Sequence, residues 1–185
     1  MWKAPGDDDA LVFYKSIEFC LHVSQWNLQK IPSEEMARFV GENMKATGFK
    51  IDAAAVRLIV DEMQNVPNNV QLLCHRLWSE NQSTKRITIA GVEQTIRNLI
   101  FAYAPIFAEI WDTLTLYQQQ LLKAVAGTGG KGLTSIRNIK RFELQSSSFV
   151  IQGLKLLQQK GLVDKENDHY IFADVFFEKW VKMGR

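Results

Sequence analysis

Apolar side chains recur every three or four residues through most of the chain, which is the spacing of helices with one buried face. In the first half this spacing predicts three helices, which begin at Pro32 with Ser33 as N-cap, at about Asp52 and at Pro67. Gly48 is suited to end the first of them. The side chains expected on their buried faces are Met36, Phe39, Val40, Met44, Val56, Ile59, Val60, Met63, Val70, Leu73, Cys74, Leu77 and Trp78. Three short helices of this kind predict a small bundle.

A fourth helix is expected to start at Thr88, whose hydroxyl is suited to cap it, after a polar loop over residues 81–86. Its expected buried side chains are Val92, Ile96, Leu99 and Ile100. Pro105 lacks the backbone N–H that a helix interior needs, so the sequence predicts that the helix is interrupted there. Residues 104–112 are then expected to connect this module to a second one.

Beyond residue 113 the pattern predicts a winged helix, in which three helices are followed by a β-hairpin. The first helix is expected to begin with a capping box formed by Thr115 and Gln118, and a flexible loop over residues 127–132 should follow it. The second helix should be short and cover residues 135–142. The side chains expected to point inward from these two helices are Leu121, Leu122, Val125, Ile136, Ile139 and Phe142.

The third helix of this module should be capped by the serines at 146–148 and end at Gly161. Two β-rich pieces, residues 161–163 and 169–172, flank a polar turn over residues 164–168, which is the pattern of a wing. An aromatic helix ends the chain. The inward side chains expected from these last two helices are Val150, Leu154, Leu157, Phe176, Phe177 and Trp180.

Composition and charge favour a globular protein with two modules. Of the 185 residues, 46% are hydrophobic and 23% are charged, which is far from the composition of a disordered chain. Residues 1–110 carry 11 basic and 13 acidic side chains, whereas residues 111–185 carry 11 and 7. The sequence therefore predicts a mainly α fold, with a small helical bundle over residues 1–104 and a winged-helix domain over residues 105–185.

Cysteine content and hydropathy indicate the compartment. Cys20 and Cys74 are too few for a disulfide framework, and no apolar run reaches the roughly 18 to 20 residues that span a bilayer. We therefore expect a cytoplasmic protein without a membrane segment. His22 and His75 lie near the two cysteines, but these spacings are not those of zinc sites. A buried Cys74 and no metal site are expected.

The glycine-rich sequence GTGGKG, which ends at Gly132, superficially resembles a phosphate-binding loop. That motif needs a glycine where Val125 stands and a serine or threonine where Gly132 stands, and it follows a strand, not a helix. With three histidines in the whole chain, no grouping of nucleophile, base and acid is defensible. We therefore expect no catalytic residues in this chain.

The third helix of the predicted winged helix presents a polar face that could contact duplex DNA. Gln152 and Gln159 have the hydrogen-bonding groups that read base edges, and nearby cations could hold phosphates. Because positive charge is modest here, a solvated or protein-contacting face is the favoured alternative. The candidate DNA-binding residues are Arg137, Lys140, Arg141, Ser148, Gln152, Lys155, Gln159 and Lys165.

Six segments follow one another between about Phe13 and Trp180. They are FYKSIEF, IPSEEMARFVGENMKATGFKI, NVPNNVQLLCHRLW, DTLTLYQQQLLKAVAGTGGKG, SSSFVIQGLKLLQQKGLVDK and YIFADVFFEKW. In this order and spacing they resemble the C-terminal half of prokaryotic AAA+ ATPases of the STAND type, which include archaeal-type predicted ATPases. In that family a P-loop domain binds and hydrolyses ATP, a small helical lid packs over the nucleotide, and a winged helix follows.

The resemblance implies a lid and a winged helix, with ATP and Mg²⁺ bound by a P-loop domain that is missing from this chain. The family's Gly-x-Pro lid motif, whose proline approaches the nucleotide base, aligns with Asn65, Val66 and Pro67, so Asn65 and Pro67 are candidate nucleotide contacts. Family members often have Asp-Pro before the aromatic helix, and here Asp174 keeps the acid.

Two functions from different classes follow from these observations. The first is a non-catalytic region of a STAND-like ATPase that couples nucleotide state to a regulatory surface, which binds a partner protein or DNA. The second is a stand-alone winged-helix transcriptional regulator that binds duplex DNA.

Overall fold

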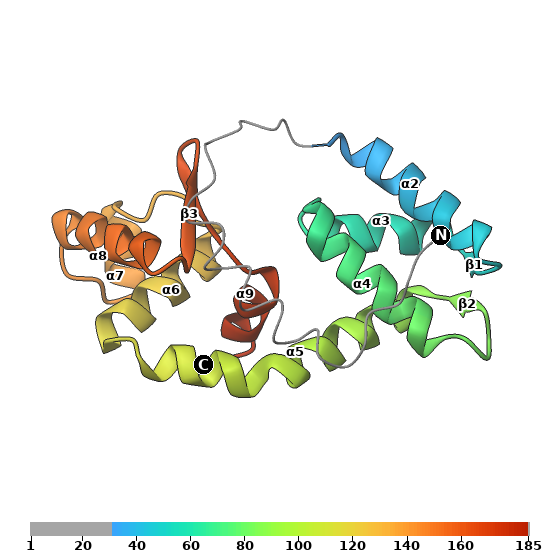
Figure 1. Ribbon diagram of the computed structural model, residues 1–185. Helices are drawn as coiled ribbons and strands as arrows, with labels where there is room; N and C mark the ends of the chain where they lie inside the picture. The colour runs from blue at the N-terminus through green and yellow to red at the C-terminus, as the bar shows by residue number, and fades with distance from the viewer. Residues whose placement is uncertain (1–30, 185) are drawn as a thin grey trace. The chain divides into compact units, whose positions relative to one another are not determined.

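The structure is a computed structural model that describes residues 31–184, of which residues 32–184 belong to one compact unit. The described chain is mainly helical, with two small sheets of two strands each (Figure 1). The mainly α fold predicted from the sequence is therefore confirmed. No helix in this part of the chain is long and apolar enough to cross a bilayer. The segment FYKSIEF, Cys20 and His22 lie outside the described residues.

The first half of the described chain is built from α2 (Ser33–Ala46), α3 (Ala53–Glu62), α4 (Pro67–Glu80) and the start of α5 (Ile89–Asp112). α2 packs on α3, and α3 and α4 pack on α5. The apolar positions at helical spacing supply the core, as predicted. Its buried side chains include Met36, Val40, Met44, Val56, Ile59, Val60, Met63, Val70, Leu73, Leu77, Val92, Ile96 and Leu99.

Two details of α2 differ from the prediction. Ser33 is the first helical residue, and Pro32 precedes it without a side-chain hydrogen bond, so Ser33 is not the N-cap. Phe39 is 62% exposed. The buried face of α2 follows every fourth residue, through Met36, Val40 and Met44, and Phe39 lies to one side of that line. The prediction that Phe39 is buried is therefore wrong.

A short parallel pair of strands was not predicted. β1 (Lys50–Ile51) follows α2, and β2 (Arg86–Ile87) precedes α5, so Arg86 lies in a strand instead of a loop. Ile51 pairs with Ile87, and both side chains are buried. Strands of two residues are too short to show an alternating pattern in the sequence.

Pro105 does not interrupt α5, contrary to the prediction, and the helix runs unbroken past it. α3 and α4 pack on this helix, and so does α9 (Val175–Lys182). Phe107 and Trp111, beyond the proline, are buried against aromatic rings of α9. This packing compensates for the hydrogen bond that proline cannot make. The predicted division between the two modules falls inside this helix and stays a prediction.

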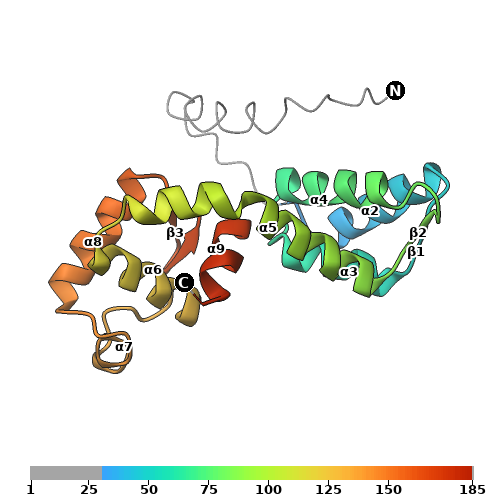
Figure 2. The same ribbon diagram turned by 90° about the horizontal axis from the view of Figure 1, so that it is seen from below.

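The second half has the element order of a winged helix (Figure 2). It contains α6 (Leu116–Thr128), α7 (Ile136–Arg141), α8 (Ser147–Gln159), β3 (Val163–Glu166) and β4 (His169–Phe172). α8 packs on α6 and on β3, and the two strands pair antiparallel. α9 then returns to pack on α5, α6 and β4.

The side chains that begin these helices are those predicted, except Ser135, for which no capping role was predicted. The Thr115 hydroxyl accepts a hydrogen bond from the Gln118 N–H, and the Gln118 side chain accepts one from the Thr115 N–H. The hydroxyls of Ser135 and Ser146 each accept a hydrogen bond from the N–H three residues later. Thr88 caps α5 in the same way. Caps of this kind satisfy N–H groups that a helix leaves open at its start.

Two details of the second half differ from the prediction. Ile136 is 75% exposed, because only Ile139 and Phe142 of this short helix pack on the core. β3 continues to Glu166, so the polar turn is much shorter than predicted. Asn167 has a φ of 52°, a left-handed conformation that asparagine tolerates, and this allows a tight hairpin.

The predicted glycine-rich loop begins only at Gly129, because α6 continues to Thr128. Gly130 has a φ of 71° and is buried against the wing. Its carbonyl accepts a hydrogen bond of 3.1 Å from the Tyr170 N–H, and its own N–H donates to the Val125 carbonyl at 2.9 Å. A Cβ atom at Gly130 would lie 1.7 Å from the Tyr170 carbonyl oxygen. Only glycine therefore allows β4 to approach the end of α6 this closely.

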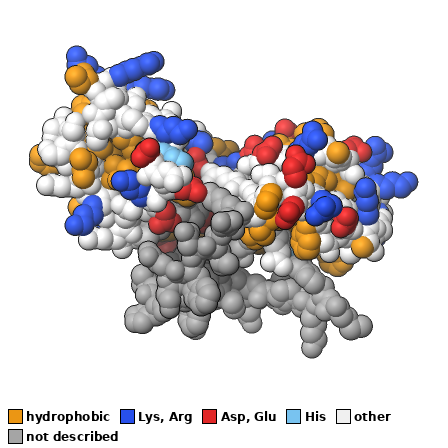
Figure 3. Space-filling view, turned by 90° about the horizontal axis from the view of Figure 1, so that it is seen from above, with side chains coloured by type: hydrophobic (Ala, Val, Ile, Leu, Met, Phe, Trp, Pro, Cys, Tyr) orange, Lys and Arg blue, Asp and Glu red, His pale blue; other side chains and the backbone are white. Residues whose placement is uncertain are grey.

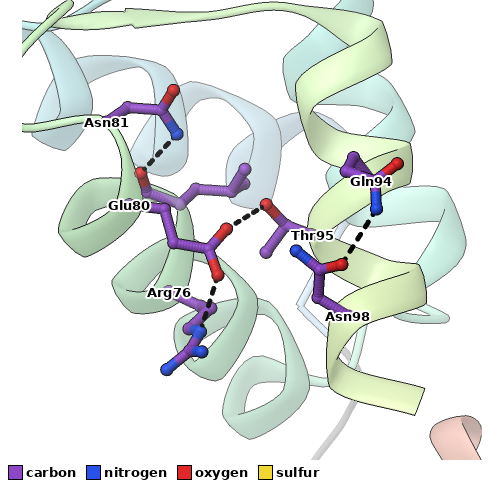
Figure 4. A network of polar contacts seen from close by, with 7 residues as sticks. Arg76, Glu80, Asn81, Gln94, Thr95 and Asn98 are labelled. Carbon is purple, nitrogen blue, oxygen red and sulfur yellow. Dashed lines mark hydrogen bonds and ion pairs between the residues drawn. The ribbon is translucent and has the colours of Figure 1, made fainter. Parts of the chain in front are cut away.

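A polar network joins α4 to α5 in the first half (Figure 4). The buried Thr95 hydroxyl donates to Glu80 Oε2 at 2.7 Å, and Arg76 Nε donates to Glu80 Oε1 at 2.8 Å. On the exposed side of α5, the Gln94 amide donates to Asn98 at 2.9 Å. The carboxylate of Glu80 therefore fixes one helix against the other at the edge of the aliphatic core.

Candidate functional site

The turn between α3 and α4 carries the two predicted nucleotide contacts, Asn65 and Pro67. The Asn65 N–H donates to the Val60 carbonyl at 2.9 Å and the Gln64 N–H donates to the Asp61 carbonyl at 3.0 Å, which is a Schellman motif. Gln64 and Asn65 have left-handed φ values of 53° and 55°. Asn65 thus adopts a conformation that glycine favours, and asparagine is among the few other residues that adopt it readily.

The outer side of this turn is apolar. Pro67 is the first residue of α4 and is exposed, and Val66 before it is 37% exposed. Proline at this position needs no hydrogen bond for its nitrogen, so the helix starts here without strain. The turn therefore exposes a small apolar surface formed by Val66 and Pro67.

Two polar contacts tie the same turn to α9, in the winged helix. Gln64 Nε2 donates to Glu178 Oε2 at 2.6 Å, and the Lys179 ammonium group pairs with the Glu62 carboxylate. Glu178 is buried and also pairs with Lys182, one turn further along α9, at 2.6 Å. The first two contacts join residues 114 and 117 positions apart in the chain. We call Glu62, Gln64, Glu178 and Lys179 the polar clamp.

Aromatic rings pack where α9 meets α5. The ring centroid of Phe107 lies 5.3 Å from that of Phe177 and 6.0 Å from that of Trp180. Trp111 meets Trp180 edge to face at 5.8 Å, and Phe172 of β4 meets Phe177 at 5.9 Å. These rings are buried, so they hold α9 firmly between the wing and α5.

Asp174 fixes the start of α9. Its carboxylate accepts hydrogen bonds from the N–H groups of Phe176 and Phe177, at 2.7 and 3.0 Å. Burial raises the pKa of Asp174 above its usual value of 3.8, and these two hydrogen bonds oppose that shift. Asp174 therefore has a structural role, as the N-cap of α9.

The candidate DNA-binding cations lie on three separate elements, α7, α8 and β3. Arg137, Lys140 and Arg141 are exposed on α7, and the Arg141 guanidinium lies over the Phe142 ring at 4.9 Å. Lys165 is exposed on β3, in the wing, where its register partner is Tyr170. The structure thus brings the three α7 cations together and places Lys165 on a different element.

The other candidates share one exposed face of α8. Ser148, Gln152, Lys155 and Gln159 are all exposed, and their spacing of four, three and four residues puts them in one line along the helix. The opposite face packs on α6 and β3. Its buried residues are Val150, Gly153, Leu154 and Leu157.

Charged side chains are distributed unevenly over the molecule. Between residues 134 and 160 the charged residues are Arg137, Lys140, Arg141, Glu143, Lys155 and Lys160, of which one is acidic. In Figure 3, charged side chains toward the left end, where the winged helix lies, are mainly blue, whereas blue and red occur side by side on the right. The surface around α7 and α8 therefore favours an anionic partner.

Cys74 lies partly buried on α4, and burial raises the pKa of its thiol to about 12. A thiol with this pKa stays protonated, whereas metals bind the thiolate. The ring of His75 stacks with that of Trp78 at 6.3 Å. Among residues 31–184, no three His, Cys, Asp or Glu side chains are grouped as metal ligands.

Sequence reasoning missed all four residues of the polar clamp. Glu62 and Gln64 belong to a helix end that looks merely polar, and Glu178 and Lys179 stand inside a run of aromatic residues. A charged residue on the buried side of an aromatic helix is the one signal available, since such a carboxylate needs a partner. The sequence does not reveal that this partner lies more than a hundred residues away.

Comparison with known proteins agrees with the fold of the second half. The family model described as a probable winged helix domain matches residues 105–183. Together with the observed element order, this match defines the second half as a winged-helix domain. No curated protein sequence matches the chain.

Among solved structures, the chain is similar to RuvB of Thermotoga maritima, a Holliday junction branch migration motor, and to single-residue variants of it. Each shows 15% identity and a TM-score of 0.40, over 78% of this chain and 47% of the RuvB chain. The aligned part of this chain thus spans about half the length of those RuvB chains. At this score the likeness supports no conclusion about function.

Proposed function

We propose that the described residues are the helical lid and winged helix of a cytoplasmic STAND-type AAA+ ATPase. ATP and Mg²⁺ bind to a P-loop domain that is missing from this chain, and the chain itself is non-catalytic. Bound nucleotide changes the position of the lid, and the lid carries the winged helix with it. The winged helix in turn presents a surface to a partner protein or to DNA.

The polar clamp is the observation that supports this coupling. It binds the turn that carries the lid motif to α9, so the turn cannot move far without moving the winged helix or breaking charged contacts. Hydrogen bonds to charged groups each contribute about 1.5–3 kcal/mol, and allosteric coupling between sites is typically about 1–3 kcal/mol. The contacts between Glu62 and Lys179 and between Gln64 and Glu178 are therefore strong enough to transmit such a change.

The residues present fit one part of a nucleotide site. Asn65 has the backbone conformation of the motif's glycine, and Val66 and Pro67 give an apolar surface for the base. They do not fit the phosphates, because the Gly130 backbone is already bonded to Val125 and Tyr170. The proposal accordingly assigns the phosphates and Mg²⁺ to the P-loop domain.

Lys179→Met tests the coupling, with Lys182→Met as the matched control on the same helix. Lys182 pairs with Glu178 of its own helix, whereas Lys179 pairs with Glu62 on α3. We expect hydrogen exchange at the amides of residues 64–66 to accelerate about tenfold in Lys179→Met and less than about twofold in the control. Equal exchange rates in the two variants would show that α9 does not hold the turn.

The ATPase assignment has its own test, which is the mass of the native protein in its source cells. We expect a species about twice the 21.2 kDa of this chain, with tryptic peptides of a P-loop domain. Purified chain should not hydrolyse ATP. A native mass of 21.2 kDa, or ATP turnover by the chain alone, would contradict the proposal.

A stand-alone DNA-binding regulator is the second candidate function, and the exposed polar line on α8 favours it. It predicts duplex DNA binding that weakens about a thousandfold or more between about 50 and 200 mM salt. Neutralising Arg137, Lys140 and Arg141 together should reduce the affinity and flatten the salt dependence. Binding that does not depend on salt would contradict this function.

A further inference from the structure

Large apolar side chains border the polar line on α8. Phe149 and Leu156 lie seven residues apart on the border that faces α6, and each is 50% exposed. The ring centroid of Phe149 lies 6.4 Å from that of Tyr117 on α6. Leu116, the residue before Tyr117, is 80% exposed. On the other border of the polar line, Ile151 is 56% exposed. Scattered apolar residues are common on surfaces, but several large ones around one helix face mark a binding surface.

These borders favour a protein partner over DNA. If α8 lay in the major groove with Gln152 and Gln159 toward the bases, the two borders would face the sugar-phosphate walls. Helices in that position place cations and hydrogen-bond donors against the walls. Here Phe149, Leu156 and Ile151 would meet the phosphates instead, and burial against phosphate gives apolar side chains little stabilisation.

α2 presents a face with the complementary character. Phe39 is 62% exposed, and Glu35 and Glu42 lie four residues before it and three residues after it. At these spacings both carboxylates lie beside the ring on one helix face. The α2 face is therefore an exposed aromatic ring between acids, whereas the α8 face is apolar beside Lys155.

These two faces cannot meet within one molecule. α2 packs on α3, α4 and β1, whereas α8 packs on α6 and β3. Both ribbon views place α2 and α8 at opposite ends of the described helices (Figures 1 and 2). A second copy of the chain can, however, bring its α2 to the α8 of the first.

We propose that the chain associates head to tail with a second copy of itself, through Phe39, Glu35 and Glu42 of α2 on one copy and Phe149, Lys155 and Leu156 of α8 on the other. In such a pair each copy keeps one unused face, so the pair retains one α2 face and one α8 face and further copies add in the same sense. The faces are small, so the association is weak and depends on concentration. It needs no nucleotide and is therefore independent of the proposed ATPase role.

Sedimentation velocity of the full chain from about 10 µM to about 1 mM tests this proposal. We expect the average mass to rise with concentration. Phe39→Ser and Leu156→Ser should each lower the association constant about tenfold, because a buried apolar anchor at an interface contributes more than about 1 kcal/mol. Phe101→Ser is the matched control, because Phe101 is 65% exposed on α5, away from both faces. Circular dichroism confirms that each variant is folded.

Mixing the two defective variants gives the sharpest result. Leu156→Ser has an unchanged α2 face and Phe39→Ser has an unchanged α8 face. One unaltered contact can therefore form between these two faces. The mixture should therefore form mainly dimers, whereas each variant alone associates about tenfold more weakly than the unchanged chain.

Three results would overturn the proposal. The first is a chain that stays monomeric up to about 1 mM. The second is association that Phe39→Ser and Leu156→Ser leave unchanged, which would place the contact elsewhere. The third is tight binding of duplex DNA that Leu156→Ser and Lys155→Glu abolish, since α8 would then be occupied by DNA.

Discussion

The two halves of the molecule are stabilised internally in different ways. In the first half, residues 31–104, aliphatic side chains such as Ile59, Leu73 and Leu77 fill the core between helices. In the winged helix, aromatic rings surround α9, and the backbone of Gly130 touches the wing directly. Aliphatic cores accept substitutions that conserve volume, whereas a close backbone approach accepts no added atom. The winged helix is therefore the half in which single positions matter most.

Gly130→Ala should give the largest effect and is the strictest test of this contrast. The new Cβ would overlap the Tyr170 backbone, which cannot move without displacing the wing. We expect the free energy of unfolding to fall by more than about 3 kcal/mol in urea titrations. Gly129→Ala is the matched control, because it has a φ of 61° but no atom within 4 Å of its Cβ position. Its expected loss is about 1 kcal/mol, and equal losses in the two variants would break the contrast.

Phe107→Ala tests the aromatic cluster and should have a comparable or slightly smaller effect. The ring contacts Phe177 and Trp180, so its removal leaves a cavity between α5 and α9. We expect a loss of about 3–4 kcal/mol by chemical denaturation. Phe101→Ala on the same helix removes a ring that is 65% exposed and should change stability by less than about 0.5 kcal/mol. A small loss at Phe107 would show that α9 is not anchored by its rings.

Thr95→Val tests how much a buried polar contact contributes to the stability of the first half. The change keeps the volume but removes the hydroxyl that donates to Glu80, which retains Arg76 and access to water. We expect a loss of about 1 kcal/mol in thermal or urea unfolding. Thr84→Val, at an exposed loop position, should change stability by less than about 0.5 kcal/mol. If Thr95→Val costs as much as Phe107→Ala, the first half is not stabilised mainly by its aliphatic core.

Asp174→Asn should show the smallest effect, as a change in pH dependence. Because burial raises the pKa of Asp174, the folded protein binds this proton more tightly than the unfolded chain does. The stability that this proton contributes is present below pH 3.8 and is lost as the pH rises through the folded value. Asparagine does not titrate but can still cap α9. The unfolding free energy of the wild type minus that of Asp174→Asn should therefore fall as the pH rises above 3.8, and a rise would contradict the assigned shift.

The contrast also explains what the sequence could predict. Helix positions in both halves followed from apolar spacing and from capping residues such as Thr88, Thr115 and Ser146, because these signals act over three or four residues. The prediction failed at Pro105, where buried rings beyond the proline outweigh its local effect. It also failed at Phe39, since periodicity shows which side of a helix is apolar but not how much of it is covered.

The candidate sites were predictable only in part. The α8 candidates lie on one exposed face because Val150, Leu154 and Leu157 fix which side of the helix is buried. The polar clamp depends on contacts between distant segments, and no local pattern reports them. Its residues become visible only when α9 is seen against the turn between α3 and α4.

The proline inside α5 has a mechanical consequence. Pro105 has no N–H to donate to the carbonyl four residues earlier, so α5 lacks one backbone hydrogen bond there. A helix bends most easily where such a backbone hydrogen bond is missing. α5 is thus easiest to bend near Pro105, and the polar clamp joins α3 and the turn after it to α9, which packs on α5 beyond the proline. Breaking the pair of Glu62 and Lys179 would therefore lower the resistance of α5 to bending at this position.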